Sequence, residues 1–499
     1  MKIYDTLSQE LKEFIPLEDN KVKMYVCGPT VYDYPHLGHA RCYITWDMVV
    51  KYLKFKGYDV TYVRNITDVD DKIINKARDA KSTPQEIAQR YYEEFSMAME
   101  ALNVASPDIE PKATENIDEM IDIIKKLVDN GYAYESDGDV YFRVKKYSKY
   151  GRLSKQSIND LESGARVEAS EKKEDPLDFT LWKATKNPDE ISWDSPWGKG
   201  RPGWHIECSA MVNRYLGVPI DIHAGGQDLT FPHHENEKAQ TEAAFDKEFV
   251  KYWMHNGFVL INEEKMSKSL GNFVTISDVL DKYDSNTIRF FILTNHYRMP
   301  VEFNDEGLKA AKAGIKRLKN AVADVKNIFG EEKIAESQGV LNSLIDEVVK
   351  TGKLPFHKID EMNYLEEKIP AEVMEKLIKE LINYINSMDE DFNTSKALAI
   401  LFDLANCAQK EKGSDKPENS ILYIALLLRL SEVLGFDLTK VEEVSDGLAS
   451  QLMDVIISVR GTARAQKNWE IADKIRDELG KLKITLKDNK DGTTSWNIE

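Results

Sequence analysis

The chain has 499 residues, a length that is enough for about three domains and a large buried core. Its formal net charge is −18, which at face value argues against a nucleic-acid partner, because Lys and Arg supply most contacts to phosphate backbones. It has no run of about 18 apolar residues and no leader-like segment at the start. We therefore expect a cytoplasmic protein that makes no contact with membranes.

A β-α-β unit is predicted near the start of the chain. The apolar strand 22–26 ends at Cys27, a helix with one apolar face follows Pro35 and ends at Gly57, and the strand 59–64 completes the unit. Ligands of such units lie at the carboxyl ends of the strands.

An insertion is predicted next. The pattern indicates helices over 84–102 and 113–130 and a hairpin around 136–139. Residues 148–201 are polar and irregular, as expected for a segment that packs beside the first domain.

The nucleotide domain is predicted to resume near Gly203. A helix around 210–215 and the strand 219–223 lead to the small residues 225–228, which are typical of a ligand-facing loop. Beyond Asn272 the pattern becomes mainly helical, and the chain closes with a small α/β piece.

One predicted helix, 307–329, has a basic edge formed by Lys309, Lys312, Lys316 and Lys319. A solvated lysine face on an ordinary helix is the simpler interpretation. Contact with RNA is the alternative, since a local basic surface can override an acidic total.

Two short motifs indicate ATP chemistry. Pro35-His36-Leu37-Gly38-His39 lies between the first strand and helix, and Lys265-Met266-Ser267-Lys268-Ser269 lies past the middle of the chain. The lysine motif is too specific to expect by chance in a chain of this length, whereas the histidine motif depends on its position beside a predicted nucleotide loop.

A metal site is a second hypothesis. His233 and Glu237 are four residues apart on a predicted helix and therefore share a face. Tetrahedral zinc needs two more donors, and Cys27 and Cys208 are the cysteines nearest to the predicted ligand loops. The alternatives are an ordinary surface pair on the helix and ordinary buried cysteines.

Six segments together resemble the cysteinyl-tRNA synthetase family, whose members are class I aminoacyl-tRNA synthetases. They are Cys-Gly-Pro-Thr-Val-Tyr-Asp at 27–33, His-Leu-Gly-His at 36–39, Arg-Asn-Ile-Thr-Asp-Val-Asp-Asp-Lys at 64–72, Gly-Trp-His-Ile-Glu-Cys-Ser-Ala at 203–210, Phe-Pro-His-His-Glu-Asn-Glu at 231–237 and Lys-Met-Ser-Lys-Ser at 265–269. The resemblance resumes at 388–398 and 464–496, so it covers nearly the whole chain.

The resemblance implies a two-step reaction in which cysteine and ATP form cysteinyl-adenylate and pyrophosphate, and cysteine then passes to the 3′ end of tRNA(Cys). His36, Gly38 and His39 are expected at the ATP phosphates, where helix N–H groups and imidazoles stabilise developing charge. Lys265 and, more directly, Lys268 are expected to hold the leaving pyrophosphate together with Mg²⁺. Asp228 is expected beside the ribose.

The family's zinc ligands correspond to Cys27, Cys208, His233 and Glu237, with one zinc per chain. Zinc favours a soft thiolate over the hydroxyl of serine and would therefore select cysteine. Trp204 and Thr67 are expected at the cysteine pocket; an ordinary buried tryptophan is the alternative for Trp204.

Anticodon reading is implied for Arg464, Trp469 and Asp473, because Arg and Trp stack on unpaired bases and a carboxylate can accept from a base amine. The alternative is a helical pair packed by Trp469 with its charges in solvent.

The expected fold class is α/β: a Rossmann-type parallel-sheet catalytic domain with an inserted domain, then a helical bundle and a small C-terminal α/β domain. The expected boundaries are 1–105 and 203–260 for the split catalytic domain, 106–202 for the insertion, 261–330 for the KMSKS and stem-contact region, 331–448 for the helical domain and 449–499 for the anticodon domain. We expect a monomer.

Two departures from the family are visible. Leu37 replaces the usual isoleucine of the histidine motif, which keeps an apolar position. Asn75 ends the run from Lys72, where some relatives have lysine, and this puts a persulfide-forming side activity in doubt.

Alternative functions are an amino-sugar cysteine ligase, whose kind lacks a full anticodon-reading end, and a non-catalytic zinc- or RNA-binding paralogue.

Overall fold

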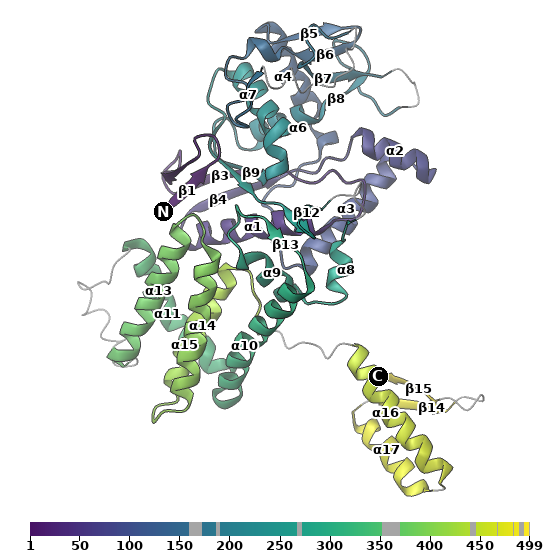
Figure 1. The fold of residues 1–499 in the computed structure, drawn as a ribbon, viewed down its shortest axis with the longest axis vertical. Coiled ribbons are helices and arrows are strands. Elements are labelled where there is room, and N and C mark those ends of the chain that lie inside the picture. Colours follow the sequence, from purple (N-terminus) through teal and green to yellow (C-terminus); the bar gives the residue numbers. More distant parts are fainter. Residues whose placement is uncertain are drawn as a thin grey trace. The chain divides into compact units, whose positions relative to one another are not determined.

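The computed structural model describes residues 1–158, 172–185, 190–266, 272–351, 370–439, 446–466, 468–482, 484–488 and 494–498. The chain divides into two compact units, Met1–Leu438 and Thr439–Glu499. Figure 1 shows the elements of each unit.

A parallel four-stranded sheet forms the centre of the first unit. Its strand order is β10-β9-β3-β4, with β3 at Lys21–Val26, β4 at Asp59–Arg64, β9 at Ile220–Gly226 and β10 at Val250–Asn256. The chain runs from β3 outward to β4, then returns to the other side of β3 for β9 and continues outward to β10. The order therefore reverses between β3 and β9, where open α/β sheets bind their ligands.

Helices flank this sheet (Figure 1). They are α1 (Leu37–Phe55), α3 (Pro84–Ala101), α6 (Trp204–Tyr215) and α7 (Glu235–Phe245), and α2 (Asp71–Ala80) packs against α3. The sequence pattern does not predict α2; the structure begins it at the N-cap Asp70, whose side chain accepts from the Lys72 amide. A hairpin of β1 (Lys2–Asp5) and β2 (Glu10–Glu13) precedes the sheet.

The inserted segment is an antiparallel sheet beside helix α4 (Ile117–Asp129). The strands run in the order β5 (Ala133–Ser136), β6 (Asp139–Phe142), β7 (Phe179–Ala184) and β8 (Gly200–Pro202). Strand β7 and the first two residues of β8 lie within 148–201, which the sequence pattern describes as irregular, so that expectation is wrong for these residues. Strand β7 pairs with the distant β6, as in Val140 opposite Trp182, and such long-range pairing leaves little local pattern.

A small sheet carries the start of the lysine motif. Strand β11 (Val259–Ile261) pairs antiparallel with β12 (Glu264–Lys265) and parallel with β13 (Val301–Glu302). Helices α8 (Ile276–Leu280) and α9 (Ser285–Thr294) connect it to the rest of the unit.

The first unit ends in a helical region. Its helices are α10 (Asp305–Phe329), α11 (Glu331–Thr351), α13 (Ala371–Asp389), α14 (Thr394–Lys412) and α15 (Asn419–Val433). Their buried faces belong to the same apolar core as α1 and β3, and α15 packs against α1.

The second unit contains α16 (Asp446–Ala465), α17 (Trp469–Lys481) and the antiparallel pair β14 (Ile484–Asp488) and β15 (Thr494–Ile498). Among the described residues, no helix is both long and apolar enough to cross a bilayer.

Candidate active site and metal centre

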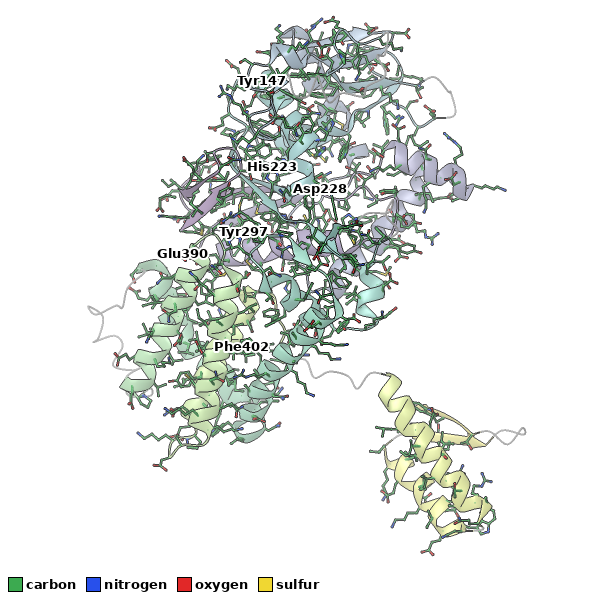
Figure 2. The ribbon with its side chains drawn as sticks, viewed as in Figure 1. Tyr147, His223, Asp228, Tyr297, Glu390 and Phe402 are labelled. Atoms are coloured by element: carbon green, nitrogen blue, oxygen red, sulfur yellow. The ribbon has the colours of Figure 1, made fainter. Side chains whose placement is uncertain are left out.

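A chamber of about 320 Å³ lies at the carboxyl ends of β3 and β9. Its walls come from both ATP motifs and from the predicted metal and ribose residues; they include Cys27, His36, Gly38, His39, Trp204, Asp228, Lys265 and Met266. His223 on β9 and Asp228 after it lie in the middle of the first unit (Figure 2). The reversal of strand order thus brings together residues that are far apart in the sequence.

The histidine motif forms the N-terminus of α1. The Gly38 amide donates to His36 Nδ1 at 3.0 Å, and the His36 amide donates to His39 Nδ1 at 3.2 Å. The two imidazoles are stacked with their centroids 3.9 Å apart. Both rings are therefore held at a helix N-terminus, where N–H groups and the helix dipole favour an anion such as phosphate.

The described part of the lysine motif lies beside the histidine motif. Lys265 is exposed and its Nζ is 4.2 Å from the centre of the Phe258 ring. Met266 is buried, and its Cε lies 3.7 Å from the position that a Cβ atom on residue 38 would take. Lys268 lies outside the described residues.

The segment after the lysine motif joins the two motifs. The Leu37 amide donates to the Val274 carbonyl at 3.2 Å, and the Ile276 amide donates to the Pro35 carbonyl at 3.0 Å. His36 also meets the Phe273 ring edge to face, with centroids 5.1 Å apart. The lysine motif is thus tied by backbone hydrogen bonds to the start of α1.

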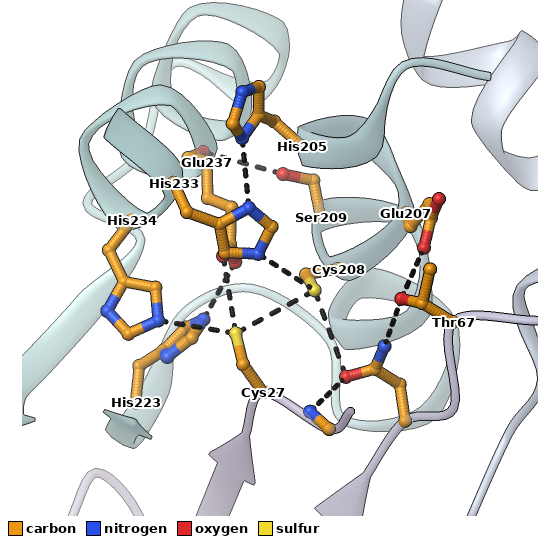
Figure 3. Close-up of polar contacts among 12 residues, drawn as sticks. Cys27, Thr67, His205, Glu207, Cys208, Ser209, His223, His233, His234 and Glu237 are labelled. Atoms are coloured by element: carbon orange, nitrogen blue, oxygen red, sulfur yellow. Dashed lines mark hydrogen bonds and ion pairs between the residues drawn. The ribbon is translucent and has the colours of Figure 1, made fainter. Parts of the chain in front are cut away.

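Four buried donors meet behind this chamber (Figure 3). Cys27 Sγ is 3.8 Å from Cys208 Sγ and 3.4 Å from Glu237 Oε1. His233 Nε2 is 3.6 Å from Cys208 Sγ and 3.0 Å from Glu237 Oε1. Cys27 follows β3, Cys208 belongs to α6, and the other two come from the start of α7 and the turn before it.

These distances fit a tetrahedral metal. Zn–S and Zn–N bonds of about 2.3 and 2.0 Å place the ligand atoms of a tetrahedron about 3.2 to 3.8 Å apart. Three of the four distances fall in this range, and the His233–Glu237 distance of 3.0 Å is slightly shorter. The donors include two thiols, an imidazole and a carboxylate, a set that suits zinc among the common divalent ions. The residues present therefore fit a zinc ion.

The electrostatics of the cluster favour the metal-binding form of two of its four donors, Glu237 and Cys208. Burial raises the pKa of Glu237, but the charges of His223 and His233 outweigh it and hold the pKa well below its usual value. Burial also raises the pKa of Cys208, and the hydrogen bonds from Cys27 and His233 more than reverse this shift. Carboxylate and thiolate are the protonation states in which these two residues bind a metal. Burial, together with Cys208 and Glu237, raises the pKa of Cys27 well above its usual value, and Glu237 and Cys208 outweigh burial to raise the pKa of His233 to about 10. Cys27 and His233 must therefore lose a proton when a metal binds.

Three more histidines surround the four-donor cluster, and the sequence pattern does not predict them. His223 Nε2 lies 2.8 Å from Glu237 Oε2, and His234 Nε2 lies 3.2 Å from Cys27 Sγ. His234 Nδ1 in turn lies 2.8 Å from His255 Nε2. Such partners orient metal ligands. The sequence offered two signals for these histidines: His234 directly follows His233, and His223 lies on β9, which ends at the ligand loop.

Cys27, His223, His234 and Glu237 form a second group whose donor atoms come equally close. Desolvation by burial lowers the pKa of His234 well below its usual value, which keeps this imidazole neutral. The second group shares Cys27 and Glu237 with the first, so the two candidate metal positions overlap.

The two residues expected at the cysteine pocket border the cluster. Thr67 is buried and donates from Oγ1 to Glu207 Oε2 at 2.8 Å. Trp204 is 37% exposed, and its ring centroid is 4.1 Å from that of His233. Trp204 also lines a second cavity, of about 1050 Å³, between the catalytic sheet and the inserted strands. It is therefore a wall between two cavities and not an ordinary core tryptophan.

The residues expected at the anticodon lie in the second unit. Trp469 begins α17 and is 56% exposed, so it does not pack this helical pair as the alternative interpretation required. Asp473 is one turn further along and forms an ion pair with Arg476 at 3.1 Å. Arg464 lies in the last turn of α16.

The comparisons with known proteins define the class. The family model for the class I (C) tRNA synthetase catalytic domain matches residues 13–313, and the DALR domain model matches 383–439. The fold is shared with a LeuRS–tRNA–LeuAMS complex of Agrobacterium radiobacter K84, at a TM-score of 0.59, 13% identity and coverage of 85% and 86% of the two chains. It is also shared with methionyl-tRNA synthetase of Mycobacterium tuberculosis, at a TM-score of 0.54, 16% identity and coverage of 83% and 89%. The molecule is a class I tRNA synthetase, which confirms the predicted α/β fold class.

The relatives define the family more narrowly. The chain is 46% identical over 496 residues to the cysteine–tRNA ligase of Geobacillus thermodenitrificans, covering 99% of this chain and 98% of that protein. It is 47% identical over 508 residues to the cysteine–tRNA ligase of Fusobacterium nucleatum, covering the whole of both. The chain belongs to the cysteine–tRNA ligase family, as its motifs predict.

Proposed function

We propose that this chain activates cysteine with ATP in the chamber at the carboxyl ends of β3 and β9 and then transfers it to tRNA(Cys). One observation carries the proposal. Cys27 belongs both to the chamber wall, which the two ATP motifs share, and to the buried four-donor cluster. An ATP site and a thiol-selective metal site therefore adjoin through one residue.

The metal site accounts for the choice of amino acid. Cys27, Cys208, His233 and Glu237 hold one zinc ion, which when bound supplies selective recognition of a thiolate. A purely apolar pocket separates near-isosteres by only about 1 to 3 kcal/mol. Trp204 covers the His233 side of this pocket. Thr67, which is buried in the loop after β4 and donates to Glu207, is assigned to the same pocket.

The two motifs account for the activation step. His36 and His39 stabilise charge at the α-phosphoryl group, Gly38 lets the nucleotide approach the start of α1, and Asp228 binds the ribose. Lys265 and Lys268, with Mg²⁺, bind the leaving pyrophosphate.

Transfer RNA is bound by two separate surfaces. Lys309, Lys312 and Lys316 are exposed along one edge of α10, which follows the lysine motif and contacts the tRNA stem. Arg464, Trp469 and Asp473 read the anticodon. The protein acts as a monomer.

Cysteine-dependent exchange of pyrophosphate into ATP tests the function, with serine as the control substrate. We expect exchange with cysteine and almost none with serine at equal concentration. Exchange that is equal for both amino acids would contradict the role of the metal site, and absence of exchange would contradict the activity itself.

A further inference from the structure

Arg41 is a buried cation bound by a cage of backbone carbonyls. It follows the histidine motif on α1 and is 1% exposed. One terminal nitrogen donates to the Ile292 carbonyl at 2.6 Å, and the other donates at 3.0 Å to each of the carbonyls of His296, Tyr297 and Met299. Burial lowers the pKa of Arg41 to about 10, so the guanidinium is charged at neutral pH. All four bonds go to the end of α9 and the loop behind it.

This loop, residues 295–300, supports the strands of the lysine motif. The Tyr297 carbonyl also accepts from the Gly257 amide at 2.8 Å, and the Val301 amide donates to the Phe258 carbonyl at 2.9 Å. Strand β13, which follows the loop, then pairs with β11, and β11 pairs with β12 at Lys265. A continuous set of backbone hydrogen bonds thus runs from Arg41 to the lysine motif.

The helical region supports the same loop from outside. Asp391 accepts from Tyr297 Oη at 2.8 Å and from Arg298 Nε at 2.7 Å. Thr394 Oγ1 donates to the Leu293 carbonyl at 2.6 Å. In Figure 2, Tyr297 and Glu390, the neighbour of Asp391, lie where the helical region meets the catalytic core. The segment Met388–Thr394, prominent in the sequence, therefore fixes the outer side of the loop.

We propose that Arg41 is a positioning residue for adenylate formation: it holds the 295–300 loop, and through it the strand that bears Lys265, at a set distance from His36 and His39. The requirement is geometric, since a displacement of about 1 Å in a reacting group costs about 100-fold in rate. A lysine at this position keeps the charge but presents one nitrogen and cannot reproduce the fork that reaches four carbonyls. The inference rests on the proposed role of the lysine motif in pyrophosphate binding.

The test compares Arg41→Lys with Arg289→Lys in the full-length, zinc-loaded enzyme. Arg289 is the control because it is also fully buried and donates to backbone carbonyls, those of Leu434, Leu102 and Asn103. It also forms a buried ion pair with Asp47 on α1, but none of these contacts is with residues 295–300. Exchange rates are divided by the number of active sites from an adenylate burst, which removes the effect of unfolded protein. We expect Arg41→Lys to lower the rate per site by about 30- to 100-fold, with the KM for cysteine within about twofold of the wild type. The exchange rate per site of Arg289→Lys should stay within about threefold of the wild-type rate.

A double variant shows whether Arg41 acts through Lys265. When Lys265 is already alanine, Arg41→Lys should lower the exchange rate per site by a factor at least about fivefold smaller than it does in the wild type, because the group that Arg41 positions is absent. If Arg41→Lys does not fold, Asp391→Asn loosens the same loop from outside and should lower the rate per site by about 3- to 10-fold with no change in the KM for cysteine.

Several results would overturn the inference. They are a rate per site near that of the wild type in Arg41→Lys, an equal loss in Arg289→Lys, a parallel rise in the KM for cysteine, or independent effects in the double variant. If Lys265→Ala lowers exchange and Arg41→Lys does not, only the positioning role fails. If neither change has an effect, the assignment of Lys265 to pyrophosphate binding fails as well.

Discussion

At the scale of single residues, the centre of this protein is a set of buried donors whose neighbours control their protonation. Glu237 is fully buried and yet keeps a lowered pKa, because His223 and His233 both face its oxygens. The four donors lie within 4.8 Å of one another and pair through hydrogen bonds and an ion pair. The cluster is therefore consistent with a zinc site.

Replacement of one donor tests the metal. We expect Cys208→Ser to lose most of its zinc, measured by elemental analysis, and to lose at least about 100-fold of its preference for cysteine over serine in exchange assays. Cys407→Ser is the control, since Cys407 is half-buried in α14 and belongs to neither donor group. A zinc-free Cys208→Ser enzyme that still rejects serine would contradict the metal's role in selection.

A second residue makes a pH-dependent contribution to stability. Asp5 is buried, and burial would raise its pKa, but hydrogen bonds from Lys12, the Trp253 amide and Ser8 hold the pKa below its usual 3.8. A lowered folded-state pKa means that the stabilisation is complete above about pH 4 and is lost as the pH falls through the folded value.

We expect Asp5→Asn to lose about 2 kcal/mol at pH 7, seen as a lower thermal midpoint, and its difference in stability from the wild type to narrow as the pH falls from about 4 to about 2. A difference in stability between the two proteins that stays constant over this pH range would show that the charge of Asp5 does not contribute to it.

At the scale of elements, the loops after β3 and β4 are joined edge to edge, and this contact forms the floor of the site. The Gly28 amide donates to Asn65 Oδ1 at 2.8 Å, and the Val31 amide donates to the Thr67 carbonyl at 3.1 Å. A side chain on Gly28 would overlap the Asn65 carbonyl. The glycine of the first motif is thus needed for a close approach of two backbones.

Two glycine-to-alanine changes should therefore have opposite effects. We expect Gly28→Ala to destabilise the first unit by about 3 kcal/mol and to impair cysteine binding, because the loops must separate. Gly339→Ala, within α11 and with open space around it, should stabilise by about 0.5 to 1 kcal/mol. Thermal midpoints measure both; a neutral Gly28→Ala would contradict the close approach.

At the scale of the whole molecule, chemistry and anticodon reading are proposed for different units. The ATP and metal residues all lie in Met1–Leu438, and the predicted anticodon residues lie in Thr439–Glu499. Each unit has its own buried residues, so a change on the surface of the second need not disturb the first.

Trp469→Ala separates the two activities. We expect the kcat/KM for tRNA to fall by about 5- to 100-fold, since stacking of one base contributes about 1 to 3 kcal/mol, while cysteine-dependent pyrophosphate exchange stays unchanged. Ile471→Ala, also exposed on α17, is the control and should retain tRNA charging. Equal losses in both variants would indicate damage to the unit and not loss of a base contact.

Local pattern was sufficient where a signal lies within a few consecutive residues. The strands 22–26 and 59–64 were predicted from short apolar runs and match β3 and β4. Strands β7 and β8 were missed because their partners lie far away in the chain, and α2 was missed because only two of its residues, Ile73 and Ala77, are buried.

The sequence by itself determined the class, the family and the two ATP motifs, because each motif is written in adjacent residues whose chemistry does not depend on distant neighbours. The resemblance also predicted Cys27, Cys208, His233 and Glu237 as one set of ligands, and the structure brings them together. Tertiary structure alone decided that further histidines surround this cluster and that Arg41 holds the support of the lysine motif. These contacts join residues from different strands, helices and loops. They exist only because the strand order reverses between β3 and β9 and packing then fixes the helices around that point.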